Sequence, residues 1–143
     1  MMRRALGLAE EAALWGDVPI GAVVTRDGEP IALAGNEREK RHDPTAHAEV
    51  LALRQAAEAL GGWRLPDTTI YVTLEPCAMC AGAISLARVP RLVFAATDPK
   101  AGAVGGVTNL FESQLVNHRP AVESGVLAEE SGRLLSEFFA ERR

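Results

Sequence analysis

The spacing of hydrophobic positions predicts a helix followed by a β-hairpin in the first third of the chain. Apolar side chains recur at helical spacing within residues 2–15, at Leu6, Ala9, Ala13 and Leu14. Gly16-Asp17 is a stop signal for this helix. Two apolar runs follow, Ile20–Thr25 and Ile31–Ala34, and the turn pair Asp27-Gly28 separates them. Such runs around an Asp-Gly pair predict two hairpin strands.

The rest of the chain alternates helical and extended patterns. A polar loop is expected from Asn36 to Asp43, and a helix over Ala46–Leu60 that Gly61-Gly62 ends. The later patterns predict, in order, a strand at Thr69–Leu74, a helix at Ala78–Ala87, a strand at Arg91–Ala96, a glycine-containing loop from Thr97 to Asn109, a short strand at Ala121–Ser124 and a helix at Val126–Arg142. Strands that alternate with helices indicate an α/β fold with a mixed sheet.

Composition is consistent with one folded domain over residues 1–143. Hydrophobic residues make up 48% of the chain and charged residues 24%, which supplies a substantial core and excludes a disordered chain. No repeat or linker interrupts the pattern. No apolar stretch approaches the length of a membrane span, and the N-terminus lacks a cleavable signal pattern. We therefore expect a cytoplasmic protein without a membrane partner.

Charge gives only local support for a nucleic-acid partner. The formal net charge is −4, whereas nucleic-acid-binding proteins usually carry a basic surface. Basic residues are nevertheless grouped at Arg38, Lys40 and Arg41, just before a histidine-containing segment, and at both ends of the chain. Each group alone is typical of an ordinary solvated surface. An acidic protein with basic residues collected near one site can still bind a phosphate backbone.

Two short motifs supply the residue types of a catalytic metal site. His47 is followed two residues later by Glu49, and Cys77 and Cys80 form a C-x-x-C motif. One imidazole and two thiolates can bind zinc and leave its fourth tetrahedral position to water. Both motifs fall at predicted helix starts. Since side chains two residues apart on a helix diverge by about 200°, His47 and Glu49 can share only a site beyond the helix N-terminus.

Together these motifs match the known H-x-E…P-C-x-x-C signature of zinc nucleobase deaminases. Zinc lowers the pKa of a bound water to about 7, and helix N-termini favour the thiolate form of its cysteine ligands. Glu49 is then placed to take a proton from that water and pass it to a ring nitrogen and the leaving amine. The sequence therefore predicts hydrolytic deamination of an aminopurine or aminopyrimidine.

Each motif also has an ordinary interpretation when it is taken alone. A single helical histidine or glutamate is usually a surface residue, and a C-x-x-C motif can be a redox pair or half of a structural zinc site. For His42, surface or loop placement is the expected role rather than metal binding, and the same expectation applies to His118. The order and spacing of the four motif residues favour the catalytic metal site over these alternatives.

Further segments carry a family resemblance over nearly the whole chain. They are residues 17–24 (DVPIGAVV), 35–36 (GN), 43–49 (DPTAHAE), 71–84 (YVTLEPCAMCAGAI), 98–103 (DPKAGA), 117–118 (NH), 125–127 (GVL) and 138–143 (FFAERR). In these segments the sequence resembles the bacterial tRNA-specific adenosine deaminases, a branch of the cytidine deaminase superfamily. The metal motif is shared across the superfamily, and the flanking segments narrow the resemblance to the tRNA branch.

The resemblance implies a fold, an assembly and an activity. It implies a three-layer α/β/α sandwich with a mixed five-stranded sheet, and a homodimer. The implied reaction is the conversion of the wobble adenosine to inosine in the anticodon stem-loop of an arginine tRNA. In that reaction water activated by Zn²⁺ attacks C6 of the base.

The resemblance also implies a role for particular residues. His47, Cys77 and Cys80 are implied to bind one zinc ion per chain, with Glu49 as the proton shuttle. Asn36 is implied to hydrogen-bond the flipped base. The implied pocket for that base is lined by Val18, Ala48, Leu74, Glu75 and Pro76. Residues implied to contact the anticodon loop are Asn117, His118 and, within the terminal segment 138–143, Phe139 and Arg142.

Three other functions remain open on the sequence. The first is the same chemistry on a free nucleobase or nucleoside, of the guanine or cytosine type. A second is a non-catalytic, zinc-bearing RNA-binding subunit, although such a protein has no use for the Glu49 carboxylate. The third is a thiol oxidoreductase that uses Cys77 and Cys80 without a stoichiometric metal. Substrate comparison, substitution of Glu49 and metal analysis distinguish these alternatives.

Overall fold

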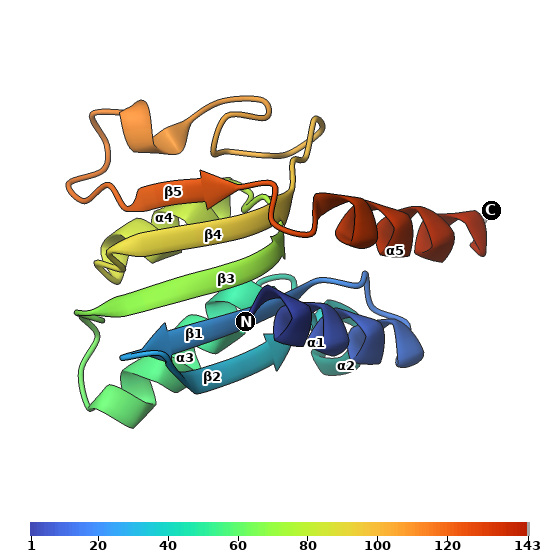
Figure 1. Ribbon diagram of the computed structural model, residues 1–143, viewed down its shortest axis with the longest axis horizontal. Coiled ribbons are helices and arrows are strands. Elements are labelled where there is room, and N and C mark those ends of the chain that lie inside the picture. Colours follow the sequence, from blue (N-terminus) through green and yellow to red (C-terminus); the bar gives the residue numbers. More distant parts are fainter. Residues whose placement is uncertain (143) are drawn as a thin grey trace.

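The computed structural model describes residues 1–142 and contains one mixed five-stranded sheet (Figure 1). Its strands are β1 (Gly21–Arg26), β2 (Glu29–Gly35), β3 (Thr68–Leu74), β4 (Arg91–Ala96) and β5 (Ala121–Ser124), in the spatial order β2-β1-β3-β4-β5. Strand β1 is antiparallel to β2 and β3, and β4 is parallel to β3 and β5. All five strands lie where the sequence predicts them, and positive φ angles at Asp27 and Gly28 close the predicted hairpin.

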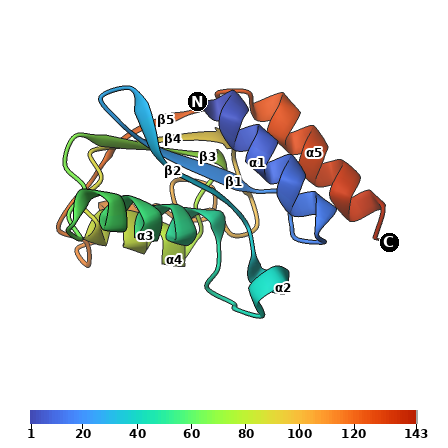
Figure 2. The ribbon, with the colours of Figure 1, turned by 90° about the horizontal axis from the view of Figure 1, so that it is seen from below.

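Helices cover both faces of the sheet, which confirms the predicted three-layer α/β/α sandwich. Helices α1 (Met2–Leu14) and α5 (Ala128–Ala140) lie side by side on one face, and α3 (Ala48–Leu60) and α4 (Ala78–Leu86) lie on the other (Figure 2). Each agrees with a predicted helix to within two residues. Within residues 1–142, no helix combines the length and the apolar character needed to cross a membrane.

Alternating side chains along the strands build a core on each face of the sheet. In β1, Ala22 and Val24 belong to the large cluster under α3 and α4. Val23, between them, points the other way and packs with Met2 and Ala5 of α1. The buried stripe of α1 does not include Leu14, which is 86% exposed although its spacing predicted a place on the apolar face.

Two short helical turns are present where the sequence predicted none. Helix α2 (Arg38–Arg41) lies inside the segment predicted as a loop, and a 3₁₀ turn, η1 (Leu110–Glu112), follows the glycine-containing loop. The α2 turn forms because distant polar side chains accept its first backbone N–H groups, most directly those of Asp17. The hydrophobic pattern of the segment itself contains no sign of this long-range capping.

Three chain segments meet at one edge of the sheet and form a candidate site there. Strands β3 and β4 are parallel, so their carboxyl ends, Leu74 and Ala96, lie next to each other. Because β1 is antiparallel to both of its neighbours, the carboxyl end of β2 at Gly35 reaches the same edge. Ligands of open α/β sheets bind outside the carboxyl ends of such strands. The segments after β2, β3 and β4 are therefore expected to carry the chemical groups of the site.

Candidate active site

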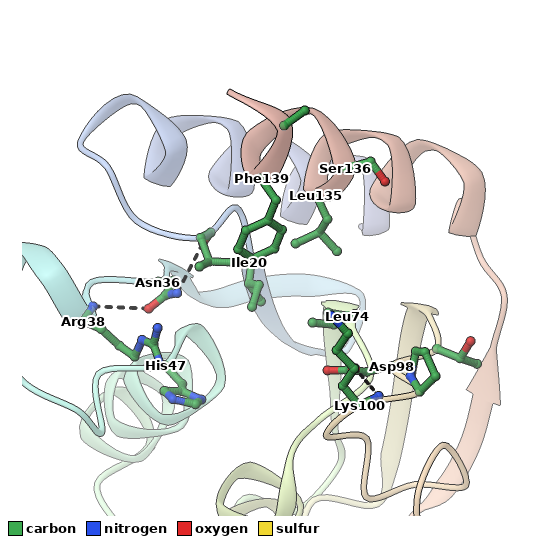
Figure 3. A pocket seen from close by; sticks show the side chains of 14 residues that line it. Ile20, Asn36, Arg38, His47, Leu74, Asp98, Lys100, Leu135, Ser136 and Phe139 are labelled. Carbon is green, nitrogen blue, oxygen red and sulfur yellow. Dashed lines mark hydrogen bonds between the residues drawn. The ribbon is translucent and has the colours of Figure 1, made fainter. Parts of the chain in front are cut away.

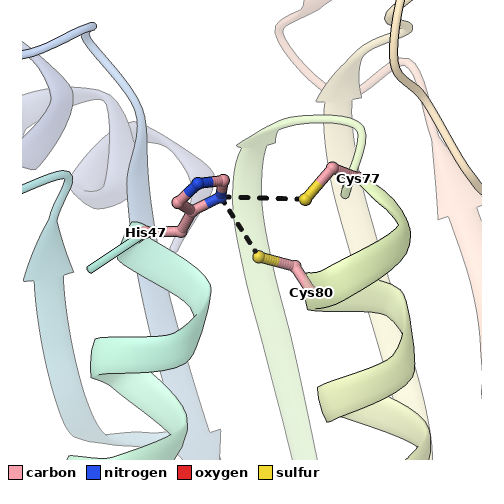
Figure 4. A group of neighbouring side chains, drawn as sticks. All are labelled: His47, Cys77 and Cys80. Atoms are coloured by element: carbon pink, nitrogen blue, oxygen red, sulfur yellow. Dashed lines mark hydrogen bonds between the residues drawn. The ribbon is translucent and has the colours of Figure 1, made fainter. Parts of the chain in front are cut away.

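Three metal-ligand atoms converge between the N-termini of α3 and α4 (Figure 4). His47 is the N-cap of α3, Cys77 is the N-cap of α4, and Cys80 lies in the first turn of α4. The Nδ1 atom of His47 lies 3.7 Å from the Cys77 sulfur and 3.5 Å from the Cys80 sulfur. Among residues 1–142, these three are the one such group of His, Cys, Asp and Glu side chains.

The spacing of these atoms fits a tetrahedral zinc ion. With bonds of about 2.0–2.1 Å to nitrogen and about 2.3 Å to sulfur, tetrahedral geometry separates the two ligand atoms by about 3.6 Å. Both measured nitrogen–sulfur distances lie within about 0.1 Å of that value. The donor set also fits, since mixed sulfur and nitrogen ligands favour zinc over harder ions. Three protein ligands are the usual number in catalytic zinc sites, which keep one position for water or substrate.

Local turns place the two N-cap residues at the ends of their helices. His47 has an extended backbone, with φ −70° and ψ 149°, and Cys77 is similar, with φ −74° and ψ 177°. Each can therefore turn its side chain beyond the helix while its carbonyl accepts the first helical hydrogen bond. The sequence placed His47 inside the first helical turn, whereas it is the residue before that turn.

A tight turn directly before His47 fixes the entry to α3. The Asp43 carboxylate accepts hydrogen bonds of 2.8 Å from the backbone N–H and from the hydroxyl of Thr45. These bonds lower the pKa of Asp43, the hydroxyl bond having the larger effect. The carbonyl of Ala46 accepts a hydrogen bond from the N–H of Glu37, so the turn is also tied to the α2 segment.

The mutual interactions of the three ligand residues favour one thiolate. A hydrogen bond from the Cys80 thiol, followed by one from His47, lowers the pKa of Cys77 to about 4. The same interaction with Cys77, together with burial, raises the pKa of Cys80 above its ordinary value. Cys77 also raises the pKa of His47. Protons shared in this way among three ligand atoms are those that a bound metal ion displaces.

Glu49 places a buried carboxyl group beside the ligand atoms. Its side chain is in the first turn of α3, and the residue is only 4% exposed. Burial raises its pKa to about 7, and a hydrogen bond from its own backbone N–H opposes that rise. It is not a member of the ligand group. A carboxyl group next to, but outside, the ligand set can exchange protons with a molecule bound at the metal.

A pocket of about 730 Å³ opens beside His47, which is one of its lining residues. Figure 3 shows its labelled side chains arriving from three directions. On one side are Asn36, Arg38 and His47; opposite are Leu74, Asp98 and Lys100; helix α5 closes the third side with Leu135, Ser136 and Phe139. The volume is within the range of small-molecule and cofactor sites. A nucleoside-sized group fits such a space.

The Asn36 side of the pocket is held by residues from the end of α1. The buried carboxylate of Asp17 accepts hydrogen bonds from the backbone N–H of Glu39, at 2.8 Å, and of Lys40, at 3.2 Å. The indole N–H of Trp15 donates to the backbone carbonyl of Asn36, and the Lys40 ammonium lies 4.2 Å from the Trp15 ring centroid. These contacts fix α2 against the α1 end.

Of the three basic residues grouped before His47, only Arg38 lines the pocket. Lys40 and Arg41 both form ion pairs with Glu37, at 3.4 Å and 2.6 Å, on the solvent side of α2. Their positive charges are therefore partly compensated. Lys100, which the composition did not single out, supplies a second cation to the pocket.

The other predicted site residues fall into two groups. Val18, Leu74 and Phe139 line the pocket with Asn36. The residues that do not line it are Ala48, which is fully buried, and Glu75, Pro76, Asn117, His118 and Arg142.

Three of these side chains have other contacts. Asn117 lines a second pocket of about 250 Å³, and the His118 Nε2 atom lies 2.6 Å from the carbonyl oxygen of Val89. Arg142 stacks on Phe138 at 3.5 Å from the ring centroid. Arg143, at the end of the predicted RNA-binding segment, lies outside the described residues.

Several pocket residues were not nominated as site residues from the sequence. They are Ile20, Thr97, Asp98, Pro99, Lys100, Leu135, Ser136 and Ala140. The segment Thr97–Lys100 could have been found, because it directly follows the carboxyl end of a strand parallel to β3. Leu135 and Ser136 of α5 carried no such signal, since their spacing indicates only a packed helix, whereas Ala140 belongs to the segment 138–143 that the resemblance implied to contact the anticodon loop.

Comparison with known proteins places the chain in a family. The family model of MafB19-like deaminases matches residues 1–143. A tRNA-specific adenosine deaminase of Bacillus subtilis is 51% identical over 142 residues, which are 99% of this chain and 88% of that protein. A tRNA-specific adenosine deaminase of Haemophilus influenzae is 50% identical and aligns over the full length of this chain and 83% of its own.

Two solved structures of deaminases are similar to this chain. A structure from a study of A-to-I editing by tRNA:A34 deaminases at the wobble position of transfer RNA has a TM-score of 0.92 and 48% identity, over 94% of this chain and 97% of the other. Guanine deaminase from Bacillus subtilis has a TM-score of 0.67 and 37% identity, over 99% and 90% of the two chains. The fold, the ligand group and these likenesses together show that the chain is a deaminase that belongs to the tRNA-specific adenosine deaminase family.

Proposed function

We propose that this protein converts adenosine to inosine in the anticodon loop of tRNA, with one zinc ion bound by His47, Cys77 and Cys80. The observation that carries the proposal is the buried Glu49 carboxyl beside three ligand atoms spaced for zinc, next to a nucleoside-sized pocket. When bound, zinc supplies a water molecule activated for attack at neutral pH. The wobble position and the arginine tRNA follow from the family resemblance.

Glu49 carries the proton transfers in the proposed reaction. Its carboxylate takes a proton from the attacking water and delivers it to ring nitrogen N1 of adenine. Oxygen bonds to C6, the C6–N6 bond breaks, and a second proton passes through the same carboxyl to the departing amine. Adenosine and water thus give inosine and ammonia, with no other reactant. Burial of Glu49 keeps bulk water away from these transfers.

Asn36 has the hydrogen-bonding capacity that recognition of the base requires. Its side-chain oxygen accepts a bond from the N–H of Arg38 at 3.2 Å, and its amide nitrogen donates to the Val18 carbonyl at 3.3 Å. A carboxamide has two N–H groups and two lone pairs, so one of each remains for a ligand. We assign this free pair to the flipped base, beside the apolar side chains of Val18, Ile20 and Leu74.

The charges at the pocket support an RNA substrate. Arg38 on one side and Lys100 on the other supply two cations that can contact the phosphates of a bound strand. Loop nucleotides are unpaired and can be turned out of their stack at low cost. We keep Phe139, Arg142, Asn117 and His118 as proposed contacts to the loop outside the pocket.

We also propose a homodimer that acts in the cytoplasm, where its tRNA substrate is found. The dimer is supported by the resemblance and by an apolar groove of about 300 Å³ on the outer side of α3 and α4. Its lining includes Leu53, Trp63 and Leu86, and the last two are 57% and 69% exposed. Contiguous exposed apolar side chains of this kind mark contact surfaces.

A substrate comparison tests the proposed function. Purified, zinc-loaded protein is incubated with an anticodon stem-loop that carries adenosine at the wobble position, and separately with free adenosine, cytidine and guanine. The proposal predicts inosine in the stem-loop and no more than trace turnover of the free compounds. Turnover of guanine alone would instead assign the chain the activity of its guanine deaminase neighbour. A stem-loop with guanosine at the wobble position is the matched control.

A further inference from the structure

The Glu75 carboxyl group is buried without taking part in the ligand group or in the lining of the main pocket. It lies directly after β3, between Leu74, which lines the pocket, and Pro76, which precedes the ligand Cys77. Only 2% of the residue is exposed. Burial of a carboxylate without partners is costly, so its surroundings must supply hydrogen bonds.

Those hydrogen bonds come from the backbone of the loop after β4. The Glu75 oxygens accept N–H bonds from Asp98 at 2.9 Å, Val104 at 2.9 Å and Gly106 at 2.8 Å. The three donors are spread over positions 98 to 106 of the chain, yet they converge on one side chain. Hydrogen bonds to a charged acceptor are roughly twice as strong as neutral ones. The loop is therefore wrapped around this carboxylate.

Two glycines permit this close wrapping. A Cβ atom added at Gly102 would lie 2.3 Å from the Glu75 carboxyl carbon. One added at Gly106 would lie 2.6 Å from a Glu75 oxygen and 2.3 Å from the Asp98 carbonyl oxygen. Distances this short are not tolerated between such atoms. The loop can therefore approach the Glu75 carboxylate this closely only because positions 102 and 106 are glycines.

The loop also contacts both functional parts of the site. Its first residues, Asp98, Pro99 and Lys100, line the main pocket opposite Asn36. Further along, the N–H of Ala103 donates to the carbonyl of Pro76 at 2.9 Å. Glu75 therefore holds a loop that serves two parts of the site. Residues 98–100 of this loop line the pocket, and Ala103 is hydrogen-bonded to Pro76, next to the ligand Cys77.

We propose that Glu75 is a positioning residue for the nucleic-acid substrate: it fixes the loop 97–106 so that Lys100 faces the bound strand. This inference rests on the proposed function for its substrate. The sequence resemblance implied that Glu75 itself lines the base pocket, whereas its carboxyl group is occupied by three backbone donors. Its effect on the substrate is therefore exerted through the loop.

Glu75→Gln tests the proposal with little change in shape. The new amide keeps one acceptor oxygen but presents N–H groups to backbone N–H groups, so part of the bonding is lost. We expect KM for the anticodon stem-loop to rise about tenfold or more, which corresponds to loss of charge-assisted hydrogen bonds, while kcat changes less than about threefold. Zinc content is expected to stay at one ion per chain.

Gly106→Ala is an independent variant with the carboxylate intact. Its added methyl group displaces the loop from Glu75, so we expect the same rise in KM. Gly7→Ala is the matched control, because nothing lies within 4 Å of a Cβ at this exposed position of α1. Amide hydrogen exchange should accelerate over residues 98–106 in both loop variants and remain unchanged in the control.

The outcomes separate this inference from the proposed function. An unchanged KM in folded Glu75→Gln and Gly106→Ala proteins would overturn the inference. Loss of zinc with a fall in kcat would do the same, because it would assign Glu75 to the metal site. If Glu75→Gln does not fold, Gly106→Ala alone decides. If the wild-type protein leaves the stem-loop unreacted, the proposed function fails, and the exchange measurement still tests whether Glu75 organises the loop.

Discussion

The metal site and the walls of the adjoining pocket are built in different ways. In the metal site, two motifs of three and four residues place all chemical groups at the starts of α3 and α4. Two of the three pocket walls, the α2 segment and the loop 97–106, consist mostly of backbone without long regular elements. Each of these two walls is organised by one buried carboxylate from elsewhere in the chain, Asp17 for the α2 segment and Glu75 for the loop 97–106.

This difference separates chemistry from substrate binding. Helix N-termini are rigid and give the ligand atoms fixed positions, as a metal site requires. Loops that are held by a few charged hydrogen bonds can change their sequence and their substrate contacts without moving the metal ligands. We therefore expect substitutions in the metal site to lower kcat, and substitutions of the wall carboxylates to raise KM.

The largest effect is expected for Glu49→Gln, which keeps the shape of the side chain but removes its capacity to carry protons. Loss of a general acid–base group lowers kcat by about 10²- to 10⁴-fold. Because Glu49 is outside the ligand group, zinc content should remain at one ion per chain. Single-turnover kinetics and elemental analysis check both statements. Wild-type kcat in a zinc-loaded variant would remove Glu49 from the mechanism.

In protein prepared without metal, the two ligand cysteines should differ in thiol reactivity. With a pKa of about 4, Cys77 is already a thiolate at pH 6, so its alkylation rate should be flat between pH 6 and pH 8. The rate of an ordinary thiol, with a pKa near 9, rises about a hundredfold over that interval. Cys80, whose pKa is raised, should remain unreacted.

Iodoacetamide labelling with peptide mass spectrometry measures both cysteines in one experiment. Zinc should suppress the labelling of Cys77, because the metal engages the same sulfur atom. The Cys77→Ser variant controls for other labelled sites. If the alkylation rate of Cys77 rose with pH as that of an ordinary thiol does, the lowered pKa of Cys77 would be contradicted.

A smaller effect is expected for Asp17→Asn, which removes the charge of the carboxylate that holds the α2 segment. The variant loses an acceptor for the N–H of Glu39 or Lys40. Since Asn36 also accepts a bond from the start of α2, part of the turn should survive. We expect KM for the stem-loop to rise about three- to tenfold, with kcat nearly unchanged. Steady-state kinetics measure this, and Glu10→Gln on the exposed side of α1 is a matched control.

Trp15→Phe should have the smallest effect. It removes the indole N–H that donates to the Asn36 carbonyl, and it keeps an aromatic face for Lys40. Loss of one such bond lowers the free energy of unfolding by about 0.5–1.5 kcal/mol. Denaturant unfolding measures this change. A larger rise in KM than that of Asp17→Asn would mean that the indole, rather than the carboxylate, fixes this wall.

The sequence predicted the fold well because its signals are local. Continuous apolar runs predicted β1 and β2, and the Asp27-Gly28 pair located the hairpin turn. The metal ligands could also be predicted from local signals, because each motif places its side chains at the start of a single helix. H-x-E lies at the start of α3, and C-x-x-C lies at the start of α4. Only the exact helix starts shifted, so that His47 is an N-cap rather than a first-turn residue.

The pocket walls could not be predicted in this way because they depend on contacts between distant residues. Asp17 lies more than twenty residues from the α2 amides it binds, and Glu75 lies 31 residues from Gly106. The hydrophobic pattern of neither segment indicates that a distant carboxylate binds it. The α5 residues also reach the pocket through a contact between distant parts of the chain, because packing of α5 beside α1 brings Phe139 to the pocket.

The most direct test of the division between metal site and walls is the kcat and KM of Glu49→Gln and Glu75→Gln, measured together on one anticodon stem-loop with zinc-loaded protein. The account predicts that Glu49→Gln loses kcat by at least about a hundredfold with KM little changed. It predicts the opposite for Glu75→Gln, with KM raised about tenfold or more and kcat nearly wild-type. Similar losses of kcat in both variants would contradict it.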